Sequence, residues 1–472
     1  MRILLPTGRV TEELVRRAAA GFDADVAITG ELASFLSPAQ LLSLLRSSGN
    51  IYDMVLVSGM CTASFQEVEE ECGIPVYRGP RHAADLGFIL PLVREIELSR
   101  EVPADELLVG RRRKEAYSRI AKCEHDSEPV FEIRGVKIGN KSRIKVLAEI
   151  MDAHRHPDIL RAASSFFEAG ADIVDIGFGF DATAEDVKRV FSLLYHIDGP
   201  LAIDSQDPAL IDASLFRVDL ILSLHEENIG VIGHQVAQAS CGAVVVPGKK
   251  GLDDNIRLAK EAGIKKIIAD PLLQPCGSGF VESLCRFKSY SVPVFFGAGN
   301  VIELFDADSV GMAALLAGMA YETGASVIFC SEHSDKTQGC IAEMRNATDM
   351  MALMENRPYP KDLGIDSFVI KEKRRRREPP LKYASVTSAL TMPKEIEYDP
   401  CGNFRIGIED GYIVAVRNGR AVRGERWQDV LFTLLQEGGV SLMDHAGYLG
   451  AELYKAELAI RFGRSFEQDG SF

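Results

Sequence analysis

The feature that most constrains the fold is a regular alternation of short apolar runs and amphipathic stretches between residues 144 and 340. Such alternation is typical of parallel β-strands joined by helical crossovers. Eight units of roughly 20–30 residues each predict a closed (β/α)8 barrel, and a doubly wound open sheet is the alternative. The eight apolar runs are IKVLAEIM, ADIVDIGF, PLAIDS, DLILSL, GAVVVP, KKIIAD, VPVFFG and ASVIFC.

Two smaller regions flank this central part. Residues 1–100 also alternate strand-like and helix-like stretches, which predicts a small N-terminal open-sheet α/β domain. Residues 101–140 are interpreted as a helical linker followed by a β-hairpin with Arg134 and Gly135 at its turn. We assign residues 141–370 to the barrel and 383–472 to a small C-terminal α/β domain, and we interpret the basic run KEKRRRREPP between them as a solvated linker.

The composition excludes several classes of protein. A formal net charge of −15 opposes binding to nucleic acid. The nine cysteines form no CxxC pair, and the N-terminus has no signal-peptide pattern. We therefore expect the protein to be located in the reducing cytoplasm. The longest apolar runs are shorter than the roughly 20 residues that a membrane helix needs, so no membrane-spanning segment is expected.

Polar residues gather where the predicted barrel strands end, which is where the active site of such a barrel lies. An aspartate that directly ends an apolar strand needs a partner in this low-dielectric setting. One fitting partner is the N–H edge of a heterocycle such as a pterin or guanine, and the alternative is a helix cap or a lysine at the mouth. The strand-end residues that we single out are Glu149, Asp152, Asp175, Asp204, Asn228, Asp270, Asn300, His333 and Lys336.

Two other groups of polar residues remain open to more than one interpretation. The cluster around His154 and His225 matches no metal-ligand spacing, so a divalent ion that arrives with a phosphate substrate is the better candidate. Near the N-terminus, basic residues follow the first and fourth strands and are candidates for a small anion site, with ordinary loop polarity as the alternative. The N-terminal group consists of Thr7, Gly8, Arg9, Arg78, Arg81 and His82.

The strand-end segments AGADIVDIGFG, PLAIDS, IIADPLLQPCGSG and VPVFFGAGN resemble motifs of the pterin-binding barrel family. That family contains dihydropteroate synthase and pterin-dependent methyltransferases. Over its full length the chain resembles archaeal dihydropteroate synthase-like proteins, which carry extra N- and C-terminal domains. The resemblance implies that Asp204 and Asp270 bind the pterin edge, and that Asp175 is the structural or ligand-facing aspartate of strand two in the pterin site. It also implies that Asn228, or else Ser223 or His225, replaces the family's asparagine after strand four.

The chain departs from the synthase pattern at three strands. Glu149 or Asp152 stands where the family has an asparagine that helps to hold magnesium and pyrophosphate. At strand seven the synthase's basic residue is missing, and the segment that ends in Asn300 looks more like the methyltransferase branch. At strand eight the Arg-x-His of the synthase is reduced to Ser331-Glu332-His333.

The resemblance implies a transferase that joins 6-hydroxymethyl-dihydropterin diphosphate to an arylamine and releases pyrophosphate. The amine would be p-aminobenzoate or a ribofuranosyl-aminobenzene phosphate, in folate or methanopterin biosynthesis. His333, Lys336, Lys249 and Mg²⁺ would then offset the charge of the leaving diphosphate. The alternatives are a pterin-dependent methyltransferase that uses Asn300, and a pterin-binding scaffold without catalysis. We also consider a homodimer.

Overall fold

The computed structural model describes residues 1–49, 51–287, 290–354, 359–361, 363–369, 384–391 and 398–470. The chain divides into two units, residues 1–381 and 382–472. The basic run at residues 371–380 lies outside the described residues. Within the described part, no helix has both the length and the apolar character that crossing a membrane requires.

The N-terminal region is an open, four-stranded parallel sheet in the order β2-β1-β3-β4, as predicted. Its central strand β1 is buried along its whole length because both faces are covered by helices. Ser37 and Gln40 form a capping box that fixes the start of α2. The elements are β1 Ile3–Gly8, α1 Glu12–Ala19, β2 Ala24–Gly30, α2 Pro38–Ser48, β3 Met54–Val57, α3 Gln66–Cys72, β4 Val76–Arg78 and α4 Leu86–Ile89.

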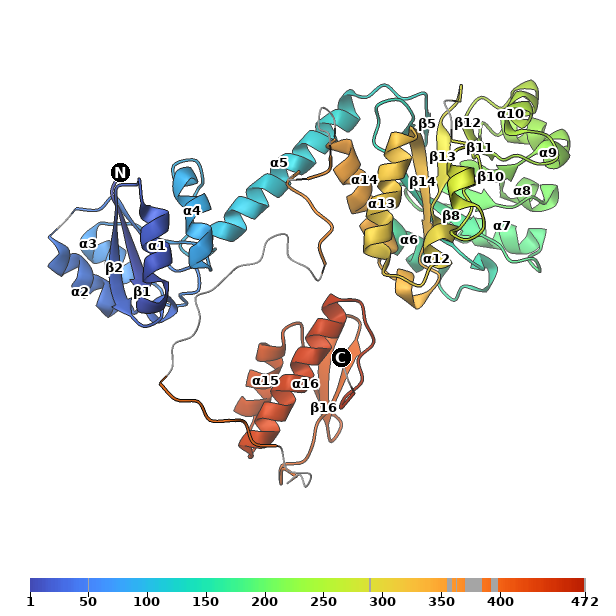
Figure 1. Ribbon diagram of the computed structural model, residues 1–472. Coiled ribbons are helices and arrows are strands. Elements are labelled where there is room, and N and C mark those ends of the chain that lie inside the picture. The colour runs from blue at the N-terminus through green and yellow to red at the C-terminus, as the bar shows by residue number, and fades with distance from the viewer. Residues whose placement is uncertain are drawn as a thin grey trace. The chain divides into compact units, whose positions relative to one another are not determined.

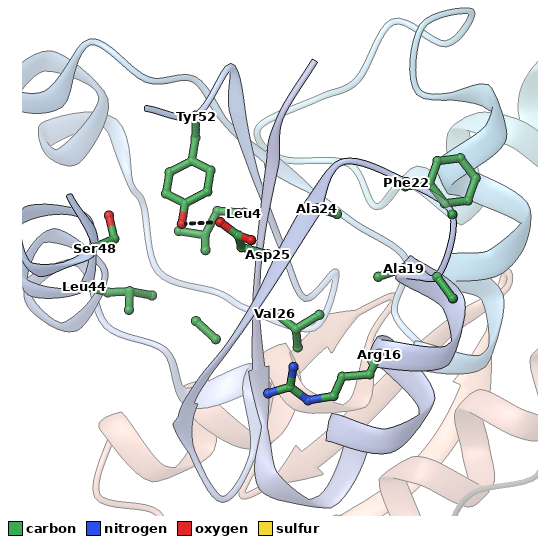
Figure 2. Close-up of a pocket in the computed structure, with 13 residues that line it drawn as sticks. Leu4, Arg16, Ala19, Phe22, Ala24, Asp25, Val26, Leu44, Ser48 and Tyr52 are labelled. Atoms are coloured by element: carbon green, nitrogen blue, oxygen red, sulfur yellow. Dashed lines mark hydrogen bonds between the residues drawn. The ribbon is translucent and has the colours of Figure 1, made fainter. Parts of the chain in front are cut away.

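Strand β2 lies at the edge of this sheet and borders a hollow of about 600 Å³ (Figure 2). The polar groups of that hollow are already engaged. The Tyr52 hydroxyl donates to Asp25 Oδ2 at 2.9 Å, and Arg2 Nη2 donates to the same oxygen at 2.8 Å. This hollow is therefore an edge of the sheet whose polar side chains satisfy one another.

Helix α5 (Ala104–Asp126) leads from this sheet to a hairpin of β5 (Phe131–Ile133) and β6 (Val136–Ile138). Arg134 and Gly135 both have positive φ, 43° and 80°, as a two-residue type I′ turn requires. The predicted hairpin is therefore confirmed. Ile133 and Ile138 join the cluster that fills the barrel interior, so the hairpin closes the N-terminal end of the barrel.

The central region is a closed barrel of eight parallel strands, which confirms the predicted (β/α)8 fold. Each of the eight apolar runs forms one strand. Helices surround this ring, as Figure 1 shows for α7 to α10. The strands are β7 Lys145–Ile150, β8 Ile173–Gly177, β9 Leu201–Asp204, β10 Leu220–Leu224, β11 Gly242–Val245, β12 Ile267–Ala269, β13 Val294–Gly297 and β14 Ala325–Ser331.

The barrel helices bury one apolar stripe each against the outside of the strands. In α7, Val187, Val190 and Phe191 are three and four residues apart and fully buried, and a capping box starts the helix at Thr183. The helices are α6 Ile159–Ala169, α7 Ala184–Leu193, α8 Pro208–Ser214, α9 Glu226–Gln238, α10 Leu252–Glu261, α11 Phe280–Leu284, α12 Gly299–Glu303, α13 Ser309–Glu322 and α14 Cys340–Ala352.

The N-terminal rim of the barrel holds buried charges in ion pairs. Arg143 Nη2 contacts Asp172 Oδ1 at 2.5 Å, and Arg143 Nε lies 3.4 Å from Asp349 Oδ1. Lys145 Nζ donates to Glu124 Oε1 of α5 at 2.8 Å. Burial opposes the charge of Asp172, but Arg143 outweighs it and lowers the pKa of Asp172. The buried charged side chains at this rim are therefore paired with charges of opposite sign.

The C-terminal unit is a three-stranded antiparallel sheet with two helices packed on one face. The elements are β15 Arg405–Glu409, β16 Tyr412–Arg417, β17 Arg420–Gly424, α15 Trp427–Gln436 and α16 Met443–Arg461. The buried Asp399 carboxylate accepts bonds from Ser441, Leu442 and Cys401 and contacts His445 Nδ1 at 2.9 Å. These donors outweigh the effect of burial and lower the pKa of Asp399.

Candidate active site at the carboxyl mouth of the barrel

Four acidic side chains come from four strands at the carboxyl end of the barrel. Glu149 is the fifth residue of β7 and pairs in register with Asp175 of β8. Asp204 ends β9 and pairs with Gly177, and Asp270 directly follows β12. The strand-end aspartates singled out in the sequence therefore lie at one rim of the barrel.

Glu149, Asp175 and Asp204 form a tight group. Each offers a carboxylate oxygen, and these oxygens lie within 4.8 Å of one another. Both oxygens of Asp175 are buried without a well-formed hydrogen bond to any described residue. Across the described part of the chain, no lysine, arginine or histidine forms an ion pair with these three carboxylates or with Asp270. The group is a concentration of negative charge without an internal counter-ion.

This concentration makes protons hard to remove from the group. Burial raises the pKa of Glu149 to about 7, and the neighbouring Asp204, Asp152 and Glu303 add to the effect. Burial also raises the pKa of Asp175 well above its ordinary value, with further contributions from Asp204 and Glu149. Like charges that share a site disfavour each other's ionisation. A ligand that brings positive charge or N–H donors would relieve this cost.

Asp270 and Asp204 are each held by one local donor. The Asp270 Oδ1 atom accepts a bond from the Leu272 N–H at 2.8 Å, and Asp204 Oδ1 accepts one from the Ser223 hydroxyl at 2.8 Å. Burial raises the pKa of Asp270 to about 7, and Asp204 contributes to that rise. The pKa of Asp204 is itself raised by burial, against the Ser223 bond. Both carboxylates keep acceptor capacity towards the mouth.

The backbone around these donors adopts an unfavourable conformation. Ser223 has φ of 63°, Leu272 has φ of 62° and Asp152 has φ of 48°. Positive φ is uncommon for residues other than glycine, and such strained positions tend to cluster at functional sites. Here the strain places the Ser223 hydroxyl and the Leu272 N–H against the two aspartates.

Glycines make room for the acidic groups on the loop after β8. A Cβ atom at Gly177 would lie 2.6 Å from Glu149 Oε1, and one at Gly179 would lie 2.6 Å from Asp152 Oδ1. Asp152 is exposed and lies beside the tight group rather than within it. The structure thus joins Glu149 to Asp175 and Asp204 as candidate metal ligands, whereas the sequence pointed to Glu149 and Asp152.

Asn228 is buried in the first turn of α9, and its amide is engaged within the protein. Its Oδ1 atom accepts a bond from the His225 N–H at 2.9 Å. Its Nδ2 atom donates to the carbonyls of Gln206 and Ser223 at 3.3 Å. Asn228 therefore fixes the end of β10, where Ser223 in turn holds Asp204.

The remaining predicted residues come from the loops after β13 and β14. Asn300 and His333 are exposed. Lys336 Nζ donates to the Phe305 carbonyl at 2.8 Å and lies 3.3 Å from Asp306 Oδ1. The ammonium group of Lys336 is therefore tethered to the loop after α12.

Glu303, at the end of α12, organises the loop after β14 and was not singled out in the sequence. Its Oε1 atom accepts bonds from Ser331 Oγ, Thr337 Oγ1 and the His333 N–H at 2.8–3.0 Å, and its Oε2 atom accepts one from Ser334 Oγ at 2.5 Å. Burial raises the pKa of Glu303, but these donors outweigh it and lower the pKa overall. The hydroxyl-rich segment SEHSDKT is the only trace of this arrangement in the sequence.

The tight group suits a hard divalent cation such as Mg²⁺, which prefers carboxylate oxygens. The fit rests on the three converging oxygens and on the two unpaired oxygens of Asp175. Glu149, Asp175 and Asp204 would hold the ion. Such an ion would supply positive charge against a bound phosphate group.

Comparison with known proteins places the chain in a family. The uncharacterized protein MJ0107 of Methanocaldococcus jannaschii is 32% identical over 516 residues, which cover 99% of this chain and 98% of that protein. The chain belongs to the family of this archaeal protein. The family model PterinBD-DUF4346 matches residues 398–469, within the C-terminal unit. The predicted membership among archaeal dihydropteroate synthase-like proteins, with a barrel and two flanking domains, is confirmed.

Solved structures with a similar barrel include two bacterial synthases. The Yersinia pestis dihydropteroate synthase with a pterine-sulfa conjugate is 18% identical, covers 48% of this chain and 98% of its own, and has a TM-score of 0.39. The Thermus thermophilus enzyme in complex with 6HMPPP is 20% identical, covers 44% and 93%, and has a TM-score of 0.35. Since both TM-scores are low, the barrel assignment for this family member rests on its own closed ring of strands.

Proposed function

We propose that the barrel binds a dihydropterin at its carboxyl mouth and transfers its methylene group to an arylamine. The substrate would be 6-hydroxymethyl-dihydropterin diphosphate, and the products would be a dihydropteroate-type compound and pyrophosphate. The observation that carries this proposal is the convergence of Glu149, Asp175, Asp204 and Asp270 without a counter-ion among the described residues.

The pterin edge matches Asp270 and Asp204. A carboxylate accepts two parallel hydrogen bonds from an N–H/NH₂ edge, and charge-assisted bonds of this kind are among the stronger ones in proteins. The charge of Asp204 raises the pKa of both Asp270 and Asp175, so Asp204 is close enough to act on both carboxyl groups. A pterin held by Asp270 beside Asp204 would point its side chain towards Glu149 and Asp175, the other two members of the tight group.

The tight group would meet the diphosphate through a divalent cation. In the reaction the amine nitrogen forms a bond to the exocyclic methylene carbon, the bond from that carbon to the diphosphate oxygen breaks, and the amine loses a proton. Holding both substrates in line supplies much of the acceleration in such a displacement. Glu303 orders the loop that carries His333 and Lys336, whose charge and hydrogen bonds would act on the departing diphosphate. Lys249, held by Glu227 at 2.8 Å, is a further candidate.

Methyl transfer from a methyl-tetrahydropterin is the second candidate function. It is favoured by the tethering of Lys336 to Phe305 and Asp306 and of Lys249 to Glu227, since methyl transfer needs no cation for a diphosphate. The exposed Asn300 would then approach the pterin ring.

A pyrophosphate-release assay tests the proposal. The full chain would be mixed with the pterin diphosphate, Mg²⁺ and either p-aminobenzoate or a ribofuranosyl-aminobenzene phosphate. We expect pyrophosphate release to depend on the amine and on Mg²⁺. We also expect Asp270→Asn to reduce this release strongly. Asp181→Asn serves as a matched control, since Asp181 is an exposed rim carboxylate paired with Arg155. Pterin binding without any release would reject the transferase and leave methyl transfer or a scaffold.

A further inference from the structure

A separate crevice opens at the carboxyl end of the N-terminal sheet, between β1 and β3. In the order β2-β1-β3-β4 the chain leaves β1 towards β2 and leaves β3 towards β4, in opposite directions across the sheet. In open parallel sheets, ligands bind at such a switch point, outside the carboxyl ends of the strands. A cavity of about 210 Å³ lies there, with Thr7, Thr11, Leu32, Ser58, Met60 and Arg81 in its lining.

The walls of this crevice are built from closely packed backbone. A Cβ atom at Gly8 would lie 2.4 Å from the Glu31 carbonyl oxygen, and one at Gly59 would lie 2.5 Å from the Gly79 carbonyl oxygen. The ends of β1 and β3 therefore contact the loops after β2 and β4 without intervening side chains.

The charged groups around the crevice are paired with one another. Arg9 Nε lies 3.1 Å from Glu31 Oε1, and Arg81 contacts Asp105 at 2.9 Å and Glu106 at 2.6 Å. These pairs leave no uncompensated cation among these residues to attract a phosphate or carboxylate.

Two further observations oppose an anion in this crevice. Arg78 does not line the cavity; its Nη2 and Nε atoms donate to the carbonyls of Ala63 and Arg100 at 2.8 and 3.0 Å, and its buried Nη1 atom has no partner among the described residues. The first turn of α1 carries Glu12 and Glu13, which offset the positive end of that helix. The anion site considered from the sequence is thus disfavoured, and a neutral ligand fits better.

The polar edge of the crevice presents an acceptor beside a donor. Thr7 is only 2% exposed, and its hydroxyl is 2.9 Å from that of Thr11, which donates to the Gly8 carbonyl at 3.4 Å. With the proton of Thr7 directed to Thr11, Thr7 Oγ1 keeps a free lone pair. Ser58 Oγ accepts a bond from the Met60 N–H at 3.2 Å, so its own proton remains available to a ligand.

The rim of the crevice is apolar and open to solvent. Val10, Leu32 and Met60 line the cavity and are 41%, 49% and 53% exposed. Large apolar side chains around a polar floor suit a ligand with a flat apolar face and one polar edge. Methionine in particular adapts its shape to a bound ring.

From these features we infer that the crevice binds an uncharged heteroaromatic ring with a hydrogen-bond donor and acceptor side by side on one edge. Nucleobases and free pterins share this chemistry. The donor of the ring would meet Thr7 Oγ1, the acceptor would meet the Ser58 hydroxyl, and the faces would contact Leu32 and Met60. A phosphate on the ligand would lower its affinity because Arg9 and Arg81 are already paired with carboxylates. This inference is independent of the function proposed for the barrel.

Isothermal titration of the full chain with adenine, adenosine, AMP and 6-hydroxymethylpterin tests the inference. We expect one of the uncharged rings to bind, AMP to bind at least about tenfold more weakly than adenosine, and Ser58→Ala and Thr7→Val each to weaken binding about tenfold, as the loss of one hydrogen bond predicts. Met60→Ala, at an exposed position, should also weaken binding without affecting folding. Asp270→Asn should leave crevice binding unchanged and so separates it from pterin binding in the barrel.

Three results would overturn the inference. They are the absence of binding by every uncharged ring at millimolar concentration, binding that survives both Ser58→Ala and Met60→Ala, and tighter binding of AMP than of adenosine. Thermal melts of each variant identify any loss of binding that comes from unfolding. Since Met60 is exposed, a folded Met60→Ala protein with unchanged affinity counts directly against the site.

Discussion

Asp172 directly precedes β8 and Asp175 lies three residues later within that strand, yet their surroundings are opposite. Asp172, at the N-terminal rim, contacts Arg143 at 2.5 Å and accepts a bond from the Val146 N–H at 2.8 Å, and its pKa is lowered. Asp175, at the mouth, has no such partner among the described residues, and its pKa is raised. The fold satisfies the first carboxylate with an arginine and a backbone donor, and gives the second no counter-ion among the described residues.

The C-terminal unit contains a buried carboxylate that, like Asp172, is held by donors of the protein. Asp399 is surrounded by donors from Ser441, Leu442 and Cys401, which lower its pKa. A buried carboxylate that stabilises the fold is therefore recognised by its full set of donors. An unpaired carboxylate costs stability, and a cost of this kind points to function.

The largest expected effect is at the N-terminal rim. Asp172→Ala leaves Arg143 buried beside fewer acidic groups, and removing one partner of a buried ion pair costs about 3–5 kcal/mol in the free energy of unfolding. Urea denaturation measures this loss. A loss below about 1 kcal/mol would show that the rim pairs do not stabilise the barrel, and would remove the contrast with the mouth.

A substitution at Asp175 should raise the free energy of unfolding rather than lower it. Asp175→Asn removes a buried carboxyl that resists ionisation, so it should stabilise the protein at pH 8 by about 1–3 kcal/mol and change stability little below about pH 4, where the carboxyl is protonated in both the folded and the unfolded chain. If Mg²⁺ binds the tight group as proposed, it should stabilise the native protein, and the same variant should lose that stabilisation. Destabilisation at pH 8 would instead mark Asp175 as a structural residue.

Stability should fall as the pH rises towards 7. The pKa values of Glu149 and Asp270 are raised to about 7, so the folded protein binds these protons more tightly than the unfolded chain does. Their stabilising contribution is present below about pH 4 and is lost as the pH passes 7, by about 1.4 kcal/mol for each tenfold difference in proton affinity between the folded and unfolded states. Urea unfolding of the native protein and Asp270→Asn from pH 4 to 8 measures it. An identical pH profile for the two proteins would refute the raised pKa of Asp270.

The smallest expected effect is at Glu303. Glu303→Gln keeps the shape of the side chain but replaces one oxygen acceptor by an NH₂ group, so the loop after β14 should loosen at a cost of about 1–2 kcal/mol. Hydrogen exchange at residues 331–337 should rise while the rest of the barrel stays protected. Uniform exchange across the barrel would show that Glu303 stabilises the fold as a whole.

The strands and the hairpin were predictable because their signals are local. Apolar runs between amphipathic stretches define the eight strands, and Arg134-Gly135 defines the turn. The ends of parallel strands meet at one rim, so the convergence of Asp175, Asp204 and Asp270 also followed from the pattern. The hydrogen-bond and ion-pair partners of these carboxylates could not be predicted from the sequence, because they are brought together only in the folded chain.

Particular residues show where sequence reasoning stopped. Glu303 and the hydroxyls that it holds lie about 30 residues apart in sequence, so no local pattern links them. Asn228 is a strand-end polar residue by position, yet its amide is used to hold the start of α9. Asp172 and Asp175 look alike in the sequence, but Arg143 and Arg345 contact the first, whereas the carboxylates of Asp204 and Glu149 lie near the second.

The most direct test of the central claim, that the mouth carboxylates await a ligand, is calorimetric titration of a dihydropterin into the native protein and Asp270→Asn, with thermal melts of both. We predict an affinity loss of about 10–100-fold, since an amide replaces one acceptor by a donor, with no fall in melting temperature. Unchanged affinity together with a clearly lowered melting temperature would contradict the account and make Asp270 a structural residue.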